Sequence, residues 1–111
     1  MQSGAKQAMP SSVERTLRKL GGDINIARRK RSLSVEHVTQ AAGISAGTLR
    51  RLEAGEPTVS LGALAMVLLS LDLVDRLDAL VDVATDDTGL LLDIGKLPAR
   101  VTTKASRGAG L

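Results

Sequence analysis

Hydrophobic residues recur three or four positions apart along most of this chain, which is the spacing of amphipathic helices. The first such stretch runs from Val13 to Ala27 and closes in a basic run, residues 28–31, where cations favour the negative end of a helix. The adjacent Gly21 and Gly22 should weaken this helix, because each glycine disfavours helix by about 1 kcal/mol relative to alanine. We therefore expect the helix to be frayed or interrupted at that point.

Residues 33–55 predict two short helices joined by a tight turn. Ser34 and Ser45 precede these helices and can accept hydrogen bonds from the free amides of each first turn. Gly43 and Gly55 follow them, where a left-handed residue ends a helix most easily. The small apolar residues expected to hold the pair together are Val38, Ala41, Ala42, Ile44, Leu49 and Leu52.

The chain after Ser60 predicts two further helices. The first covers residues 61–71 and is apolar on nearly every face, so it must be covered on more than one side. Its expected inward residues are Leu61, Leu64, Ala65, Leu68 and Leu69, which leaves Met66, Val67 and Leu71 for other packing or for a dimer partner. Asp72 is expected to cap the second helix. That helix carries an apolar stripe of Leu73, Leu77, Leu80, Val81 and Ala84, with Asp75, Asp78 and Asp82 on another face.

Together these patterns predict an all-α fold, with five helices over residues 13–85. Residues 1–12 lack periodicity and are expected to form a flexible N-terminal arm. Residues 86–111 form a C-terminal extension, in which the apolar run Leu90–Ile94 fits either a short strand or a helix. The tail from residue 102 is rich in threonine, lysine, serine and glycine and is expected to be disordered.

Composition narrows the possible functions. The chain has no cysteine, which excludes disulfides and thiolate metal sites, and no aromatic residue on which a base could stack. His37 is the only histidine, and no carboxylates are spaced as a catalytic pair. We therefore expect no enzyme, no catalytic residues, no metal and no cofactor. The chain shows neither a membrane-spanning apolar run nor a signal peptide, so we expect a cytoplasmic protein with no membrane partner.

Charge is strongly segregated along the chain. Residues 1–51 carry ten lysines and arginines against three acids, whereas residues 52–95 carry one arginine against nine acids. A basic half attached to an acidic half suits a protein with one face on phosphate and the other turned away from it.

The two short helices resemble the Cro/lambda-repressor-like (XRE) helix-turn-helix family. The matching residues are Leu33-Ser34, Val38, Gly43-Ile44-Ser45, Thr48-Leu49, Arg51-Leu52-Glu53 and Gly55. The chain departs from the family at Val35, Thr39 and the pair Ala46-Gly47, of which the last two have no hydrogen-bonding side chains. The resemblance implies a five-helix lambda-repressor-like domain whose second short helix enters the major groove of double-stranded DNA.

Residues 20–101 also resemble HipB-type antitoxins of toxin–antitoxin pairs. The matching segments are Leu20-Gly21-Gly22-Asp23-Ile24, Ala27-Arg28-Arg29, Arg50-Arg51-Leu52-Glu53-Ala54-Gly55, Val59-Ser60-Leu61-Gly62-Ala63-Leu64-Ala65 and Leu97-Pro98-x-Arg100-Val101. This resemblance implies a homodimer that binds a palindromic operator, represses its own operon and binds a HipA-type kinase toxin. A bacterial cytoplasmic location follows, on the nucleoid when the protein is bound to DNA.

Candidate site residues follow from these resemblances and from side-chain chemistry. Thr48 and Arg50 are expected to contact base edges, with Ala46 and Gly47 allowing close approach. The candidates for phosphate contacts are Arg28, Arg29, Ser34, His37, Ser45 and Arg51. Glu53 is expected to brace the fold by pairing with a basic residue such as Arg28. The candidate partner-binding residues are Asp75, Asp78, Asp82, Leu97, Pro98, Arg100 and Val101.

Two alternatives remain open at this point. One is a stand-alone XRE-family transcriptional regulator without a toxin partner, which differs only through the Leu97–Val101 resemblance. The other is a protein-interaction module with a degenerate helix-turn-helix. Val35, Ala46 and Gly47 favour that second alternative, and the basic first half of the chain opposes it.

Overall fold

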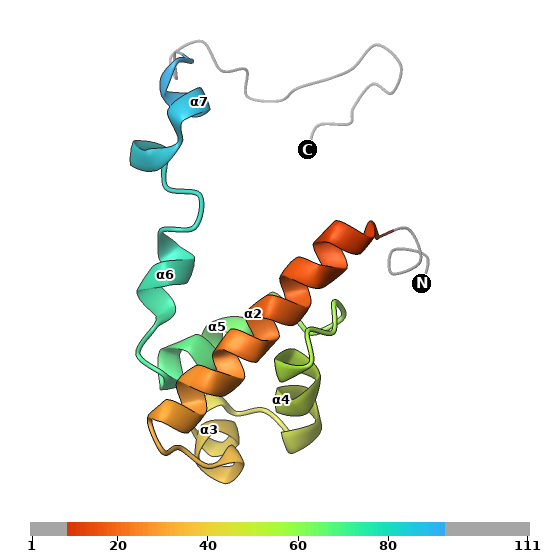
Figure 1. Ribbon diagram of the computed structural model, residues 1–111. Coiled ribbons are helices and arrows are strands. Elements are labelled where there is room, and N and C mark those ends of the chain that lie inside the picture. The colour runs from red at the N-terminus through yellow and green to blue at the C-terminus, as the bar shows by residue number, and fades with distance from the viewer. Residues whose placement is uncertain (1–8, 93–111) are drawn as a thin grey trace. The chain divides into compact units, whose positions relative to one another are not determined.

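The computed structural model describes residues 9–92, and in this part of the chain all regular structure is helical, without a strand (Figure 1). The predicted all-α class is therefore confirmed. The chain divides after Leu80 into two compact units, whereas the sequence predicted a boundary at residue 85. The helices of the first unit are α2 (Ser11–Lys30), α3 (Val35–Ala42), α4 (Ala46–Glu53), α5 (Leu61–Ser70) and α6 (Val74–Asp78). The second unit contains a 3₁₀ helix, η1 (Val83–Thr85), and a single helical turn, α7 (Asp87–Leu90).

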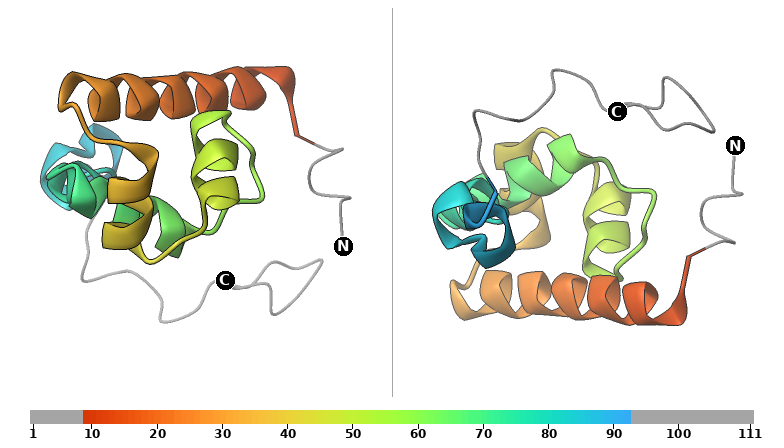
Figure 2. Two further views of the ribbon diagram at one scale, coloured as in Figure 1. Left: turned by 90° about the horizontal axis from the view of Figure 1, so that it is seen from below. Right: turned by 90° about the horizontal axis from the view of Figure 1, so that it is seen from above.

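The first unit is built around one small apolar core. Helix α2 packs on α4, α3 packs on α4 and α5, and α6 packs on α5 (Figure 2). The fully buried side chains are Val38, Leu49, Val67 and Leu71, and Ile24, Ala42, Leu52, Ala63 and Leu68 complete the core. Ala41 was expected among the inward residues, but it is exposed, because Val38 and Ala42 four positions apart define the inward face of α3.

Helix α2 is continuous from Ser11 to Lys30, contrary to the expected interruption at Gly21-Gly22. Gly21 is buried against the end of α4: a Cβ there would lie 2.5 Å from the Leu52 carbonyl oxygen and 2.6 Å from that of Glu53. The absent side chain lets the two backbones approach closely, and the packing gained offsets the poor helix propensity of glycine. Gly22 faces open space.

Helix α5 faces the core with only some of the residues expected: Leu68 is buried and Leu64 packs against the core, as predicted. Ala63, Val67 and Leu68 are buried, whereas Leu61 and Leu69, which were expected to face inward, are 74% and 55% exposed. A helix that is apolar on every side has no polar face to set its rotation, so its sequence pattern cannot identify the inward residues.

The serine caps are confirmed. The hydroxyl oxygens of Ser34, Ser45 and Ser60 each accept a hydrogen bond from the amide three residues later, at the starts of α3, α4 and α5. Left-handed residues end α3 and α4 as expected, with φ of 70° at Gly43 and 80° at Gly55.

Asp72 was expected to cap α6, but it does not. It has φ of 62° and follows the end of α5, where its amide donates to the Leu69 carbonyl and the Leu73 amide donates to the Leu68 carbonyl. This pair of hydrogen bonds is the Schellman arrangement that closes a helix. Helix α6 accordingly begins at Val74, one residue later than predicted, and has no side-chain cap.

The predicted long acidic helix is also shorter than expected. Helix α6 ends at Asp78, so Asp75 and Asp78 lie on it, but Asp82 belongs to the second unit and caps η1 instead. The prediction that Asp82 shares a helix face with Asp75 and Asp78 is therefore wrong. In the second unit, the apolar run Leu90–Ile94 begins with the last residue of the helical turn α7, and Leu91 and Leu92 follow that turn. Its last residues, 93 and 94, lie outside the described residues.

Candidate nucleic-acid interface

A small hydrogen-bond network of Ser45, Thr48 and Arg51 fixes the start of α4. The Ser45 hydroxyl oxygen accepts from the Thr48 amide at 3.1 Å, and the same hydroxyl donates to Thr48 Oγ1 at 3.0 Å. Arg51 Nη2 also donates to Thr48 Oγ1, at 3.2 Å. Because both acceptor positions of the Thr48 hydroxyl are then occupied, its own proton remains available to donate outward.

The outward face of α4 lies opposite its two buried residues, Leu49 and Leu52. This face presents Gly47, Arg50 and Arg51, at spacings of three and four residues. No hydrogen bond or ion pair engages the side chain of Arg50 within residues 9–92. Gly47 carries no side chain, and a Cβ there would lie 3.6 Å from Arg51 Nη1, so a surface that approaches the α4 backbone at this point meets the Arg51 guanidinium.

A partly buried ion pair holds the other end of α4 against α2, as expected for Glu53. Arg28 Nε donates to Glu53 Oε2 at 2.8 Å and Nη2 donates to Glu53 Oε1 at 3.1 Å, with the two side chains only 12% and 11% exposed. Arg28 Nη1 donates to the Leu33 carbonyl at 3.0 Å, which fastens the α2–α3 connection to the same group. All three guanidinium nitrogens are thus engaged inside the protein. The expected phosphate role of Arg28 does not fit this placement.

The pKa values of this pair move in the directions expected for a stable ion pair. Burial alone would raise the pKa of Glu53, but the hydrogen bonds from Arg28 and Asn25, with the charges of Arg28 and Arg29, lower it below its ordinary value. The hydrogen bond to Glu53 raises the pKa of Arg28 against the opposing effect of burial. Both groups therefore remain charged at neutral pH.

Asn25 extends this network and was missed by the sequence analysis. Its Nδ2 donates to Glu53 Oε1 at 2.8 Å, and its Oδ1 accepts from Arg29 Nε at 2.8 Å. Arg29 is exposed, and only its Nε takes part in this contact. Asn25 lies four residues after Gly21 and three before Arg28, on one stripe of α2, but this glycine and polar stripe has the pattern of an exposed helix face.

The remaining phosphate candidates are exposed at the start of α3. Ser34 caps this helix and accepts from the amide of His37, and both side chains are exposed. Figure 1 shows α3 and the start of α4 at the same end of the first unit, below the C-terminal end of α2. Among the exposed charged residues from 29 to 51, five are basic and only Glu36 is acidic. This end of the unit therefore has a positive surface.

The partner-binding candidates are divided by the structure. Asp75 and Asp78 are exposed on α6, Asp82 lies in the second unit, and residues 97, 98, 100 and 101 lie outside the described residues. Within residues 9–92, no group of three or more histidine or acidic side chains could hold a metal ion. None of the described helices combines the length and apolarity needed to cross a bilayer.

Comparisons of the chain with protein-family models, with curated proteins and with solved structures found no match. The class that the structure itself defines is an all-α protein, in which two short capped helices are joined by the turn residues 43–45. The second of these helices is braced at both ends and presents an unengaged arginine outward.

Proposed function

We propose that this chain is a sequence-specific double-stranded-DNA-binding repressor of the XRE helix-turn-helix family. The observation that supports the proposal most directly is α4, which is fixed at both ends but has Gly47 and Arg50 unengaged on its outward face. A helix is about 10–12 Å wide with its side chains, which fits the DNA major groove of about 12 Å. Rigid presentation matters because base readout depends on a fixed position of the reading helix.

Each exposed residue then has a chemical role. Arg50 reads a guanine edge through its planar pair of donors, and the Thr48 proton is donated to a base acceptor. Ala46 contacts a thymine methyl group, and Gly47 lets the helix sit deep in the groove. Arg51 stays close to Thr48 and reaches the adjacent phosphate. The other phosphate contacts come from Arg29, Ser34 and His37, at the positive end of the unit. Ser45, whose hydroxyl proton is donated to Thr48, fixes the start of α4 instead.

The protein binds DNA as a homodimer, and its operator is palindromic. Two-fold binding requires two α4 helices about 34 Å apart, which a rigid apolar interface can set. The outward face of α5 is suited to that role, because Met66 and Leu69 are 40% and 55% exposed and Gly62 and Ala65 between them are small. No charged residue lies on α5, so the face is compatible with an identical copy of itself.

We further propose that the protein is the antitoxin of a HipBA-type pair, which represses its own operon and binds a HipA-type kinase toxin. Asp75 and Asp78 support a partner surface away from DNA, because phosphate repels exposed acids. Truncation after Ile94 should leave operator binding within a few-fold but weaken capture of a co-expressed toxin. Truncated protein that loses operator binding but still captures the toxin would reverse this assignment.

The proposal is tested by measuring affinity for the promoter fragment of its own operon across a salt series. Affinity should fall steeply with salt, because each phosphate contact releases condensed counterions. Arg50→Ala should weaken binding by about 1–3 kcal/mol and relax the preference at one base pair of each half-site. Arg29→Ala should weaken binding to all sequences alike and reduce the salt slope by about one.

Arg15→Ala is the matched control, since Arg15 is an exposed arginine in the first half of α2. It should leave the base preference unchanged and have a smaller effect than Arg50→Ala. Equal affinity for the promoter and for random DNA at every salt concentration would refute sequence-specific binding. That result would favour the protein-interaction module, which the lack of polar side chains at Ala46 and Gly47 also favours.

A further inference from the structure

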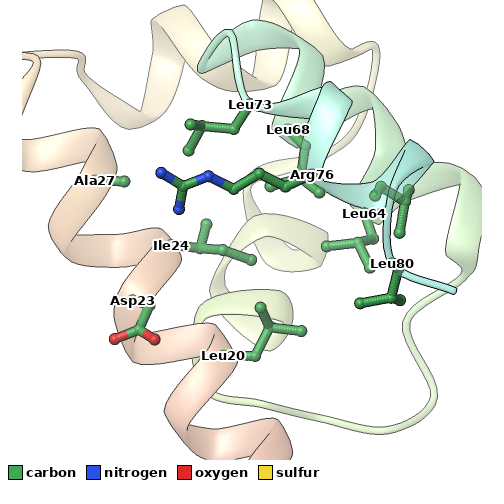
Figure 3. A pocket seen from close by; sticks show the side chains of 10 residues that line it. Leu20, Asp23, Ile24, Ala27, Leu64, Leu68, Leu73, Arg76 and Leu80 are labelled. Carbon is green, nitrogen blue, oxygen red and sulfur yellow. The ribbon is translucent and has the colours of Figure 1, made fainter. Parts of the chain in front are cut away.

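An apolar groove of about 240 Å³ lies between α2, α5 and α6 within the first unit (Figure 3). Its walls are made chiefly by Leu20, Ile24, Leu64, Leu68, Leu77 and Leu80. Leu20 at one side of the opening is 38% exposed and Leu80 at the other is 72% exposed. The groove is therefore an open apolar hollow with leucines on both sides of its mouth, on the side of α5 away from Met66 and Leu69.

One end of this groove is positively charged. A second hollow of about 220 Å³ shares Asp23, Ala27, Leu73 and Arg76 with the groove and is further lined by Lys30 and Arg31. Figure 3 shows the Arg76 side chain extended across the groove toward Ala27, so that its guanidinium lies where the two hollows meet. Within residues 9–92, no hydrogen bond or ion pair engages the side chain of Arg76.

The one acid that lines the two hollows, Asp23, forms an exposed ion pair with Lys19. Asp23 Oδ2 accepts from Lys19 Nζ at 2.7 Å. Three cations, Lys30, Arg31 and Arg76, thus surround the second hollow without an unpaired acid among its lining residues. An apolar channel that opens beside three cations selects a ligand with a hydrocarbon chain and an anionic head.

We propose that these two hollows form a binding site for an aliphatic monocarboxylate of medium chain length. The chain lies along the leucines of the groove, and the carboxylate accepts hydrogen bonds from Arg76 and is attracted by Lys30 and Arg31. A closed apolar cavity of about 150 Å³ can hold benzene, so a groove of 240 Å³ has room for a longer flexible chain. A larger occupant, such as a protein helix, would need a longer groove than the five-residue α6 provides.

The test uses the full chain, titrated with sodium decanoate below the concentration at which it forms micelles. Amide NMR spectra should show saturable shifts of Ile24, Leu64, Leu68 and Leu77, because these residues line three sides of the groove. Arg76→Gln should weaken decanoate binding about ten-fold or more, since it removes a charge-assisted hydrogen bond. Decanol, which has the same chain without the charge, should bind about ten-fold more weakly than decanoate to the unaltered protein.

Two variants show whether the loss is specific to the site. Arg15→Gln removes an exposed cation that lines neither hollow and should leave decanoate binding unchanged. Ala27→Leu places a larger side chain where the hollows meet and should block decanoate while the helical circular dichroism is retained.

Several outcomes would overturn the proposal. Equal binding of decanol and decanoate, or no effect of Arg76→Gln, would show that no carboxylate site exists. Binding to anionic phospholipid vesicles but not to dispersed decanoate would identify a lipid surface as the occupant. Groove signals that shift with protein concentration alone would identify a second copy of the chain as the occupant.

Discussion

Gly21 and Gly22 offer a direct test of how α2 and α4 pack, because the two residues are neighbours on one helix with opposite surroundings. A Cβ on Gly21 would lie 2.5–2.7 Å from three backbone atoms, of Leu52, Glu53 and Gly55, whereas a Cβ on Gly22 would meet nothing within 4 Å. Backbone atoms cannot rotate away from the added methyl group, so α4 must move away from α2. Such overpacking destabilises a fold by about 1–3 kcal/mol.

The two alanine variants should therefore shift stability in opposite directions. Gly22→Ala should stabilise the fold by about 1 kcal/mol through helix propensity alone. Gly21→Ala gains the same propensity but should be destabilised by about 2 kcal/mol net, because its contacts are all with backbone and the upper part of the overpacking range applies. The two variants then differ by about 3 kcal/mol, and at about 4–8 °C per kcal/mol for a domain of this size their Tm values should differ by about 12–24 °C.

Far-ultraviolet circular dichroism during thermal and urea unfolding is the appropriate assay, because the chain has no aromatic residue to report by fluorescence. The unaltered chain provides the reference, and Gly22→Ala provides the control for propensity. If Gly21→Ala were stabilised as much as Gly22→Ala, the close approach of α2 to the last turn of α4 would be refuted. The expected Gly21→Ala result also includes weaker DNA binding, because the displaced α4 is the proposed reading helix.

Three further predictions concern the Arg28–Glu53 ion pair, the Ser60 helix cap and the proposed dimer interface. Folding lowers the pKa of Glu53 from its ordinary value of 4.5, so the stability that its charge contributes is present above pH 4.5 and is lost as the pH falls through the lowered pKa. Glu53→Gln should therefore flatten the acid part of a plot of urea midpoint against pH. Ser60→Ala should destabilise the fold by about 1 kcal/mol in urea unfolding, because the Ala63 amide loses its acceptor; no change would mean that water replaces the cap fully. Met66→Asp should give monomers of unchanged helicity in sedimentation, since it places a charge in the proposed apolar interface, and a variant that remains dimeric would exclude this face of α5.

The capped helices and their turn could be predicted from the sequence because their signals are local. Ser34, Ser45 and Ser60 act within three residues of themselves, and Gly43 and Gly55 end helices through their own φ angles. These features need no knowledge of what lies across the fold. The same local logic failed at Asp72, because aspartate both caps helices and tolerates the left-handed conformation, and only the position of α5 decides between the two.

The inward face of α5 could not be predicted for a different reason. Its residues are apolar throughout, so every rotation buries a similar amount of apolar surface. Shape decides the rotation instead: Val67 and Leu71 fit the space left by α3, and Leu69 and Met66 are left exposed. A pattern of polar and apolar residues carries no information about such fit.

Helix α2 shows why the site could be predicted only in part. Its apolar stripe, Leu20, Ile24 and Ala27, was visible as hydrophobic periodicity, and it lines the groove with α5 and α6. Its neighbouring stripe, Gly21, Asn25 and Arg28, is made of a glycine and polar residues, which reads as an exposed face in a single sequence. The structure uses that second stripe to fasten α4, through backbone contact at Gly21 and hydrogen bonds to Glu53. One stripe of α2 thus fastens α4, the proposed DNA-reading helix, and the neighbouring stripe lines the proposed ligand groove. A substitution in either stripe can therefore be assayed for its effect on the function of the other, DNA binding or ligand binding.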